Sequence, residues 1–207
     1  MKIYFVRHGE SEANVKHVLS TEIDGYPLTE KGVRQAETLA QDLKGIRFKN
    51  IFTSPILRAV QTSQILANEL NITVIQSSAL LEYNLGVLEG REDEEAWQLH
   101  KDLFIHWGDP QKRDEKVEGG ESFNDIKRRF LPFIEHLIDE HGAEEVSVLA
   151  ISHGGLYMLM LPEILDNVDF DFILKHPLRN TAIVIGQFSA NERHCLQWGD
   201  QVMGQVS

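Results

Sequence analysis

The chain of 207 residues has little cysteine, no long apolar run and a shortage of positive charge. Its one cysteine, Cys195, cannot form an intramolecular disulfide. The lack of a second cysteine also excludes a zinc site built on paired cysteines. The apolar run at residues 3–6 is too short for the core of a signal peptide or for a membrane span. We therefore expect a cytoplasmic protein in a reducing compartment, without a membrane partner.

Positive charge is scarce: the chain has 20 Lys and Arg residues and 32 Asp and Glu residues, which gives a net charge of -12. Such a chain is repelled by nucleic acids and by anionic membrane surfaces, so we expect neither as a partner. A bound anion must instead meet a local group of arginines. With 42% hydrophobic residues the chain can bury a sizeable core, and residues 1–207 are expected to form a single domain.

Short β-branched runs alternate with longer segments of helical period, which predicts an α/β fold with a mostly parallel sheet. The expected strands lie at residues 3–6, 50–53, 72–75, 146–151 and 181–188. Apolar residues at helical spacing predict helices after Thr29, after Pro55 and after Gly120. The segment at 89–120 lacks a regular period and is expected to be a partly helical, covering insertion.

Two of the expected strands end in a histidine followed by a glycine, at His8 and at His153. Because ligands bind beyond the carboxyl ends of parallel strands, these two histidines can face each other. A lone histidine after a strand is more often structural, but a pair with Arg7 beside one of them indicates a site. Arg58 follows a third strand at the start of a helix, where an anion is favoured. Together these residues predict a phosphate site around His8.

At these residues the sequence resembles the histidine phosphatase superfamily, which includes cofactor-dependent phosphoglycerate mutases and many small-molecule phosphatases. Its motifs stand in order over nearly the whole chain, as Arg7-His8-Gly9-Glu10-Ser11, Ser54 to Thr62, Leu81-Glu82 and Ser152-His153-Gly154-Gly155. The resemblance implies a phosphoglycerate mutase-like, three-layer α/β sandwich. It also implies that His8 is transiently phosphorylated, with neither a metal nor another cofactor.

Elementary chemistry agrees with these roles. His8 must be neutral to attack, and its ordinary pKa of about 6.5, lowered further by Arg7 and Arg58, keeps it so at pH 7. Arginine suits a phosphate site because its planar guanidinium group can bind two phosphate oxygens at once. His153 is expected to donate to an equatorial oxygen of the phosphoryl group. The residues expected to bind the substrate are Asn14, Ser11, Ser20, Thr21 and Gly154. Ser11 has an alternative role, because a serine so placed more often caps a helix or turn.

Glu82 is the expected acid, which protonates the leaving oxygen and later activates water. Burial beside Leu85 would raise the pKa of Glu82, whereas the two arginines would lower it, so a bound phosphate dianion is needed to keep it protonated. A structural salt bridge between Glu82 and an arginine is the alternative.

The segment after Glu82 bears on the acceptor of the phosphoryl group. Mutases of this family carry an arginine beside the acid and a glutamine before the last glycine, where this chain has Tyr83 or Asn84 and Glu89. Loss of that cation would weaken the grip on a phosphoglycerate carboxylate. We therefore expect a phosphomonoesterase acting on a small phosphorylated metabolite, with phosphoglycerate mutase as the alternative. A non-catalytic phospho-ligand-binding module is disfavoured, because the chain retains the whole set of reactive residues.

Overall fold

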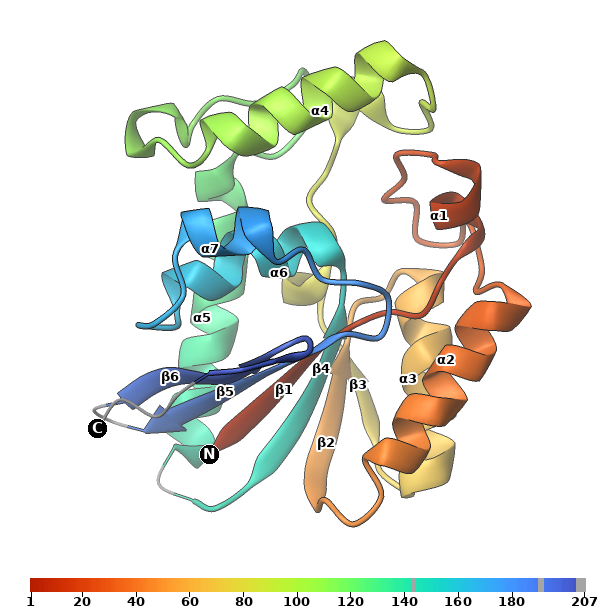
Figure 1. Cartoon of the computed structure of the whole chain (residues 1–207), viewed down its shortest axis with the longest axis vertical. Coiled ribbons are helices and arrows are strands. Elements are labelled where there is room, and N and C mark those ends of the chain that lie inside the picture. Colours follow the sequence, from red (N-terminus) through yellow and green to blue (C-terminus); the bar gives the residue numbers. More distant parts are fainter. Residues whose placement is uncertain (143, 190–191, 204–207) are drawn as a thin grey trace.

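The structure is a computed structural model that describes residues 1–142, 144–189 and 192–203. Over these ranges it has a seven-stranded sheet of order β3-β2-β4-β1-β5-β6-β7, with helices on both faces (Figure 1). The strands are β1 (Lys2–Arg7), β2 (Phe48–Thr53), β3 (Val74–Gln76), β4 (Ser147–Ser152), β5 (Ile183–Ser189), β6 (Glu192–Trp198) and β7 (Gln201–Val202).

The sheet is mixed. Its neighbouring strands β3, β2, β4 and β1 are parallel, so their carboxyl ends meet at one edge, whereas β5, β6 and β7 continue antiparallel from β1. The predicted α/β sandwich is confirmed, and the expected strands fall on β1 to β5. Strands β6 and β7 are not expected from the sequence. The residues of β6 mix charged and apolar side chains without a clear strand pattern, and β7 has only two residues. That the chain forms a single domain stays a prediction.

Alternate residues of β1 face two separate layers of helices. Ile3 and Phe5 join the core beneath one layer, and Tyr4 and Val6 join the core beneath the other. The layer on Ile3 and Phe5 contains α5 (Phe123–His141), α6 (Gly154–Met160) and α7 (Phe170–Lys175), and the opposite layer contains α2 (Glu30–Asp42) and α3 (Leu57–Leu70). All four side chains are buried, so the strand that ends at His8 is fixed from both sides.

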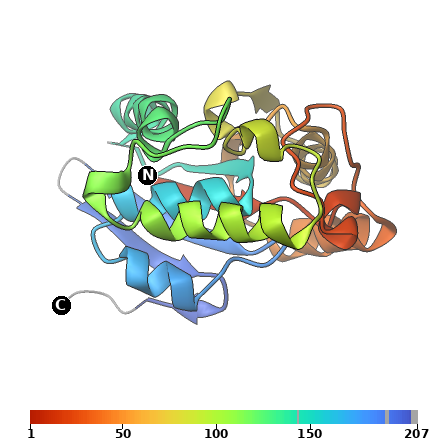
Figure 2. The same ribbon diagram turned by 90° about the horizontal axis from the view of Figure 1, so that it is seen from above.

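The remaining segments gather beyond the carboxyl ends of the parallel strands. They are α1 (Glu12–Lys16), α4 (Glu94–His106) and the 3-10 turns η1 (Ser78–Leu80), η2 (Gly86–Leu88) and η3 (Pro110–Lys112). A further 3-10 turn, η4 (Leu161–Glu163), directly follows α6. Figure 2 shows α4 lying across this end of the molecule, over α6. Trp97 ties α4 to the segment after α1, because its Nε1 donates to the carbonyl of His17 at 2.7 Å. No helix within the described ranges is long and apolar enough to cross a bilayer.

Candidate active site

The ends of β1, β2 and β4 bring His8, Ser54 and His153 together. The backbone N–H of His8 donates to the Ser152 carbonyl, and that of Ser54 donates to the Ile151 carbonyl, both at 2.9 Å, so the strand ends stay in register. The imidazole centroids of His8 and His153 lie 5.1 Å apart, and both rings are buried. The two histidines that the sequence analysis paired do meet.

His8 has an unprotonated Nε2 atom. Its Nδ1 lies 2.7 Å from the carbonyl of Gly9, which can only accept, so Nδ1 carries the proton. Nε2 accepts a hydrogen bond from Nε of Arg58 at 3.2 Å. Burial, and then the charges of Arg58 and Arg7, hold the pKa of His8 well below its ordinary value. The ring is therefore a neutral imidazole, the form that a nucleophile requires.

Three buried side-chain nitrogens near His8 lack a hydrogen-bond partner. They are Nε of Arg7, Nη1 of Arg58 and Nδ1 of His153. No other buried side-chain nitrogen or oxygen in the described residues lacks a partner. The arginines are otherwise anchored, because Nη1 of Arg7 donates to the Leu178 carbonyl at 2.6 Å and Nη2 of Arg58 to the Ser20 carbonyl at 2.9 Å. Unpaired buried donors are costly, so their clustering beside Nε2 indicates an anion site.

Ser54 orients the ring of His153, a role that the sequence analysis did not assign. Its Oγ lies 2.8 Å from Nε2 of His153 and accepts from the backbone N–H of Ile56 at 3.3 Å. The hydroxyl hydrogen of Ser54 can then be donated to Nε2, which leaves the ring proton on Nδ1. Burial, and then the neighbouring charges led by Arg58, hold the pKa of His153 well below its ordinary value. A neutral His153 can thus donate to a ligand through Nδ1.

Asn14 adds a neutral donor to the lining of a cavity that His8 also lines. Its Oδ1 accepts from the N–H and the hydroxyl of Ser11, each at 3.2 Å, and from Nδ2 of Asn180 at 3.0 Å. This network assigns the amide orientation and leaves Nδ2 of Asn14 as the donor for a ligand. Ser11 is fully buried at the start of α1, where its polar groups orient Asn14. We call Arg7, Arg58, His153 and Asn14 the phosphate clamp.

Glu82 lies at the N-terminal end of α6. Its carboxylate accepts from the backbone N–H groups of Gly155 at 3.0 Å, Leu156 at 2.7 Å and Tyr83 at 3.2 Å. Burial raises the pKa of Glu82 above the usual carboxyl value, although these backbone donors and Arg58 act in the opposite direction. Its partners are backbone groups and not guanidinium groups, which argues against the salt-bridge alternative.

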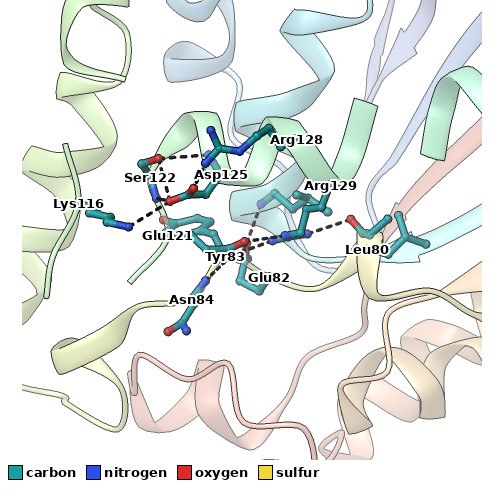
Figure 3. Close-up of polar contacts among 12 residues, drawn as sticks. Leu80, Glu82, Tyr83, Asn84, Lys116, Glu121, Ser122, Asp125, Arg128 and Arg129 are labelled. Atoms are coloured by element: carbon teal, nitrogen blue, oxygen red, sulfur yellow. Dashed lines mark hydrogen bonds and ion pairs between the residues drawn. The ribbon is translucent and has the colours of Figure 1, made fainter. Parts of the chain in front are cut away.

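Arg129 and Glu121 fix the segment that carries Glu82 (Figure 3). Arg129, on α5, donates through Nη1 to the Ala79 carbonyl and through Nε to Oε1 of Glu121, at 2.9 and 2.8 Å. Glu121 in turn accepts from the backbone N–H of Asn84 at 2.8 Å. The chain is therefore held on both sides of Glu82, by residues that the sequence analysis did not single out.

The other expected substrate-binding residues occupy different places. Ser20 and Gly154 line the cavity. A Cβ added at Gly154 would lie 3.2 Å from Nε of Arg7, so the glycine leaves room for that guanidinium. Thr21 instead binds Glu89, because its N–H and its hydroxyl donate to one carboxylate oxygen at 2.8 and 2.6 Å.

A cavity of about 380 Å³ opens over His8. Arg7, Arg58 and Glu82 line its inner part, and α4 contributes Trp97 and Phe104 to its outer wall. Within the described ranges no three His, Cys, Asp or Glu side chains are grouped so that they could hold a metal ion. The arrangement can hold a tetrahedral anion against a neutral imidazole, with a carboxyl group close by.

Comparisons with known proteins agree with this geometry. A family model described as "Histidine phosphatase superfamily (branch 1)" matches residues 3–201. A 2,3-bisphosphoglycerate-dependent phosphoglycerate mutase of Thermoplasma acidophilum is 38% identical over 175 residues, which are 77% of this chain and 87% of that protein. The probable phosphoglycerate mutase GpmB of Proteus mirabilis is 35% identical over 162 residues, which are 74% of this chain and 70% of that protein.

Solved structures show the same fold. YhfR of Bacillus stearothermophilus superposes with a TM-score of 0.80 at 28% identity, covering 100% of this chain and 98% of that one. A mycobacterial glucosyl-3-phosphoglycerate phosphatase reaches a TM-score of 0.79 at 21% identity, covering 97% and 99%. The second likeness bears on the fold alone. The predicted phosphoglycerate mutase-like fold is confirmed.

Proposed function

The chain belongs to branch 1 of the histidine phosphatase superfamily, enzymes that act on phosphorylated small molecules, and on that premise we propose that it is a metal-independent phosphomonoesterase. Its nucleophile is His8, and its substrate is a small phosphorylated metabolite. The proposal is carried by one observation: unpaired donors of Arg7, Arg58 and His153 cluster beside the unprotonated Nε2 of His8.

The first step transfers the phosphoryl group to His8. Nε2 attacks phosphorus in line with the leaving oxygen, a bond between nitrogen and phosphorus forms, and the ester P–O bond breaks. The phosphate clamp donates to the equatorial oxygens, where charge is spread in the transition state. Glu82, protonated in the substrate complex, gives its proton to the leaving oxygen, so that the product departs as a neutral alcohol.

The second step returns His8 to its starting state. The Glu82 carboxylate takes a proton from water, and the water oxygen attacks phosphorus as the bond to Nε2 breaks. Inorganic phosphate leaves, Nε2 recovers its lone pair, and Glu82 again holds a proton. The raised pKa of Glu82 suits a group that must both give and take a proton.

Phosphoglycerate mutase is the second candidate, and the 38% identity to the Thermoplasma protein favours it. The cavity lining counts against a mutase. Among the described residues that line the cavity, Arg7 and Arg58 are the only cations, and both are needed to hold the phosphate. Tyr83 is buried with its hydroxyl on His100, and Glu89 is an anion held by Thr21. A substrate carboxylate would find no further cation in the described part of this wall.

The discriminating experiment measures phosphate release and isomerisation in two separate assays. The enzyme is given a panel of phosphomonoesters in EDTA, and separately 3-phosphoglycerate with catalytic 2,3-bisphosphoglycerate. We expect release of inorganic phosphate that is lost in His8→Ala and retained in His136→Ala, whose ring is 74% exposed. Rapid isomerisation of 3-phosphoglycerate without phosphate release would establish the mutase. Absence of both reactions would contradict the proposed function and favour the non-catalytic binding module.

A further inference from the structure

The cavity wall beyond the phosphate clamp is apolar and aromatic. It is formed by Val18, Leu19, Leu85, Trp97, Phe104 and Met158. The leaving group of a phosphomonoester bound at His8 has to lie against this wall, because it occupies the same cavity. The chemistry of the wall therefore bears on the identity of the substrate.

Tyr83, His100 and Trp97 are polar side chains of this wall that already make hydrogen bonds within the protein. The hydroxyl of Tyr83 and Nε2 of His100 lie 2.5 Å apart, with the two rings stacked at 5.7 Å and an interplanar angle of 5°. Burial lowers the pKa of His100 to about 4, so its ring is uncharged at neutral pH. Trp97 donates its Nε1 to the carbonyl of His17. These groups offer no charge to a leaving group, and because Tyr83 and His100 share one contact, the pair keeps a single donor hydrogen.

The cations near the cavity either hold the phosphate or lie outside the cavity lining. Arg7 and Arg58 belong to the phosphate clamp, and Lys101 of α4 lines an adjoining groove of about 820 Å³, which shares Trp97, His100 and Phe104 with the cavity. A carboxylate on the leaving group would lose its hydration without gaining a charged partner, which is unfavourable. A polyol would lose hydrogen bonds to water that this mostly apolar wall replaces only in part.

Resting on the proposed phosphatase function, we propose that the substrate is a phosphomonoester of an uncharged, mainly apolar alcohol, whose hydrocarbon part packs against Trp97, Phe104 and Met158. A cavity of about 380 Å³ is near the lower end of the usual range for ligand sites. It suits a leaving group with one or two rings, or a short branched chain, better than a long lipid tail.

The test uses three phosphate esters that all release a primary alcohol: 2-phenylethyl phosphate, glycerol 3-phosphate and 3-phosphoglycerate. Matched leaving groups ensure that a difference in kcat/KM reports binding rather than intrinsic reactivity. We expect kcat/KM for 2-phenylethyl phosphate to exceed that for glycerol 3-phosphate by about tenfold or more, with 3-phosphoglycerate lowest. Equal or reversed values would overturn the assignment of the substrate class while leaving a phosphatase. Phosphate release from none of the three would instead refute the proposed function.

Two variants of Phe104 test whether this side chain contacts the leaving group of the substrate. Phe104→Ala should raise KM for 2-phenylethyl phosphate by about tenfold and change glycerol 3-phosphate turnover by less than about threefold. Phe104→Arg should raise kcat/KM for 3-phosphoglycerate above that of the native enzyme, a gain that misfolding cannot produce. Leu99→Ala, on the same helix and 46% exposed, is the control and should change none of the three. If Phe104→Ala lowered all three equally, or Phe104→Arg gave no gain, the proposed wall would be wrong.

Discussion

Nε of Arg58 donates a hydrogen bond of 3.2 Å to Nε2 of His8. A guanidinium group has no acceptor, so this contact requires Nε2 to be unprotonated. The same positive charge, together with burial, keeps the pKa of His8 low. Arg58 therefore lies where it can hold the imidazole in its reactive form and, through Nη1, bind the phosphoryl group.

Replacement of Arg58 by lysine tests this double role. Lysine keeps a charge but lacks the planar fork, so Arg58→Lys should lower kcat/KM by about 10²- to 10³-fold in steady-state assays. Arg34→Lys, at a side chain that is 66% exposed, is the matched control and should have no effect. Activity of Arg58→Lys within about threefold of the native enzyme would contradict the role.

The pKa shifts of His8 and Glu82 predict the pH profile. Protonation of His8 stops attack, and because its pKa is held well below the ordinary value of about 6.5, activity persists as the pH falls through 6.5. Loss of the Glu82 proton removes the acid, and because its pKa is raised, activity falls at a higher pH than an ordinary carboxyl group would give.

The measurement is kcat/KM for an alkyl phosphate against pH, corrected for the second ionisation of the ester, with NMR titration of the His8 ring. An imidazole that titrates near 6.5 in the free enzyme would contradict the account of His8. Persistence of the alkaline limb in Glu82→Gln would contradict the role of Glu82.

Ser54 is expected to act through His153. Without its hydroxyl, Nε2 of His153 loses the 2.8 Å contact and the ring proton is no longer fixed on Nδ1, so Ser54→Ala should lower kcat by about tenfold with little change in KM. The double variant with His153→Ala should be no worse than His153→Ala alone. Additive losses in this cycle would show that Ser54 acts by another route.

Gly155 tests the placement of Glu82. A Cβ at this position would lie 2.8 Å from Oε1 of Glu82 and 2.5 Å from Cε1 of Tyr83, so Gly155→Ala must displace the acid. We expect kcat for alkyl phosphates to fall by about 10²-fold, the lower limit for loss of an acid, while circular dichroism stays native. Gly25→Ala, whose Cβ meets the flexible side chain of Glu22, should keep full activity. Native turnover by Gly155→Ala would mean that the carboxyl position is unimportant.

Much of the site could be predicted because it lies at strand ends. His8, His153 and Arg58 follow β1, β4 and β2, and parallel strands place their carboxyl ends at one edge whatever the loops do. Glu82 was identified through a motif, and the structure adds the reason for its position: α6 begins beside it and supplies two backbone donors.

The rest depends on contacts that no local pattern records. Thr21 is expected from the sequence to bind the substrate, and the sequence does not reveal that its N–H and hydroxyl donate to Glu89, which is far along the chain. Arg129 was indistinguishable from the other charged residues of its helix until the fold placed it against Ala79. Ser54 offered a weak signal, since it directly follows β2 as His8 follows β1.

The covalent intermediate is the most direct test of the account. The enzyme is mixed with a phosphate ester labelled in the phosphoryl group, quenched within one turnover, and mapped by peptide analysis. We predict an acid-labile, base-stable adduct on Nε2 of His8 that forms at least as fast as kcat and is absent from His8→Ala. Normal turnover without such an adduct would contradict the assignment of His8 as the nucleophile.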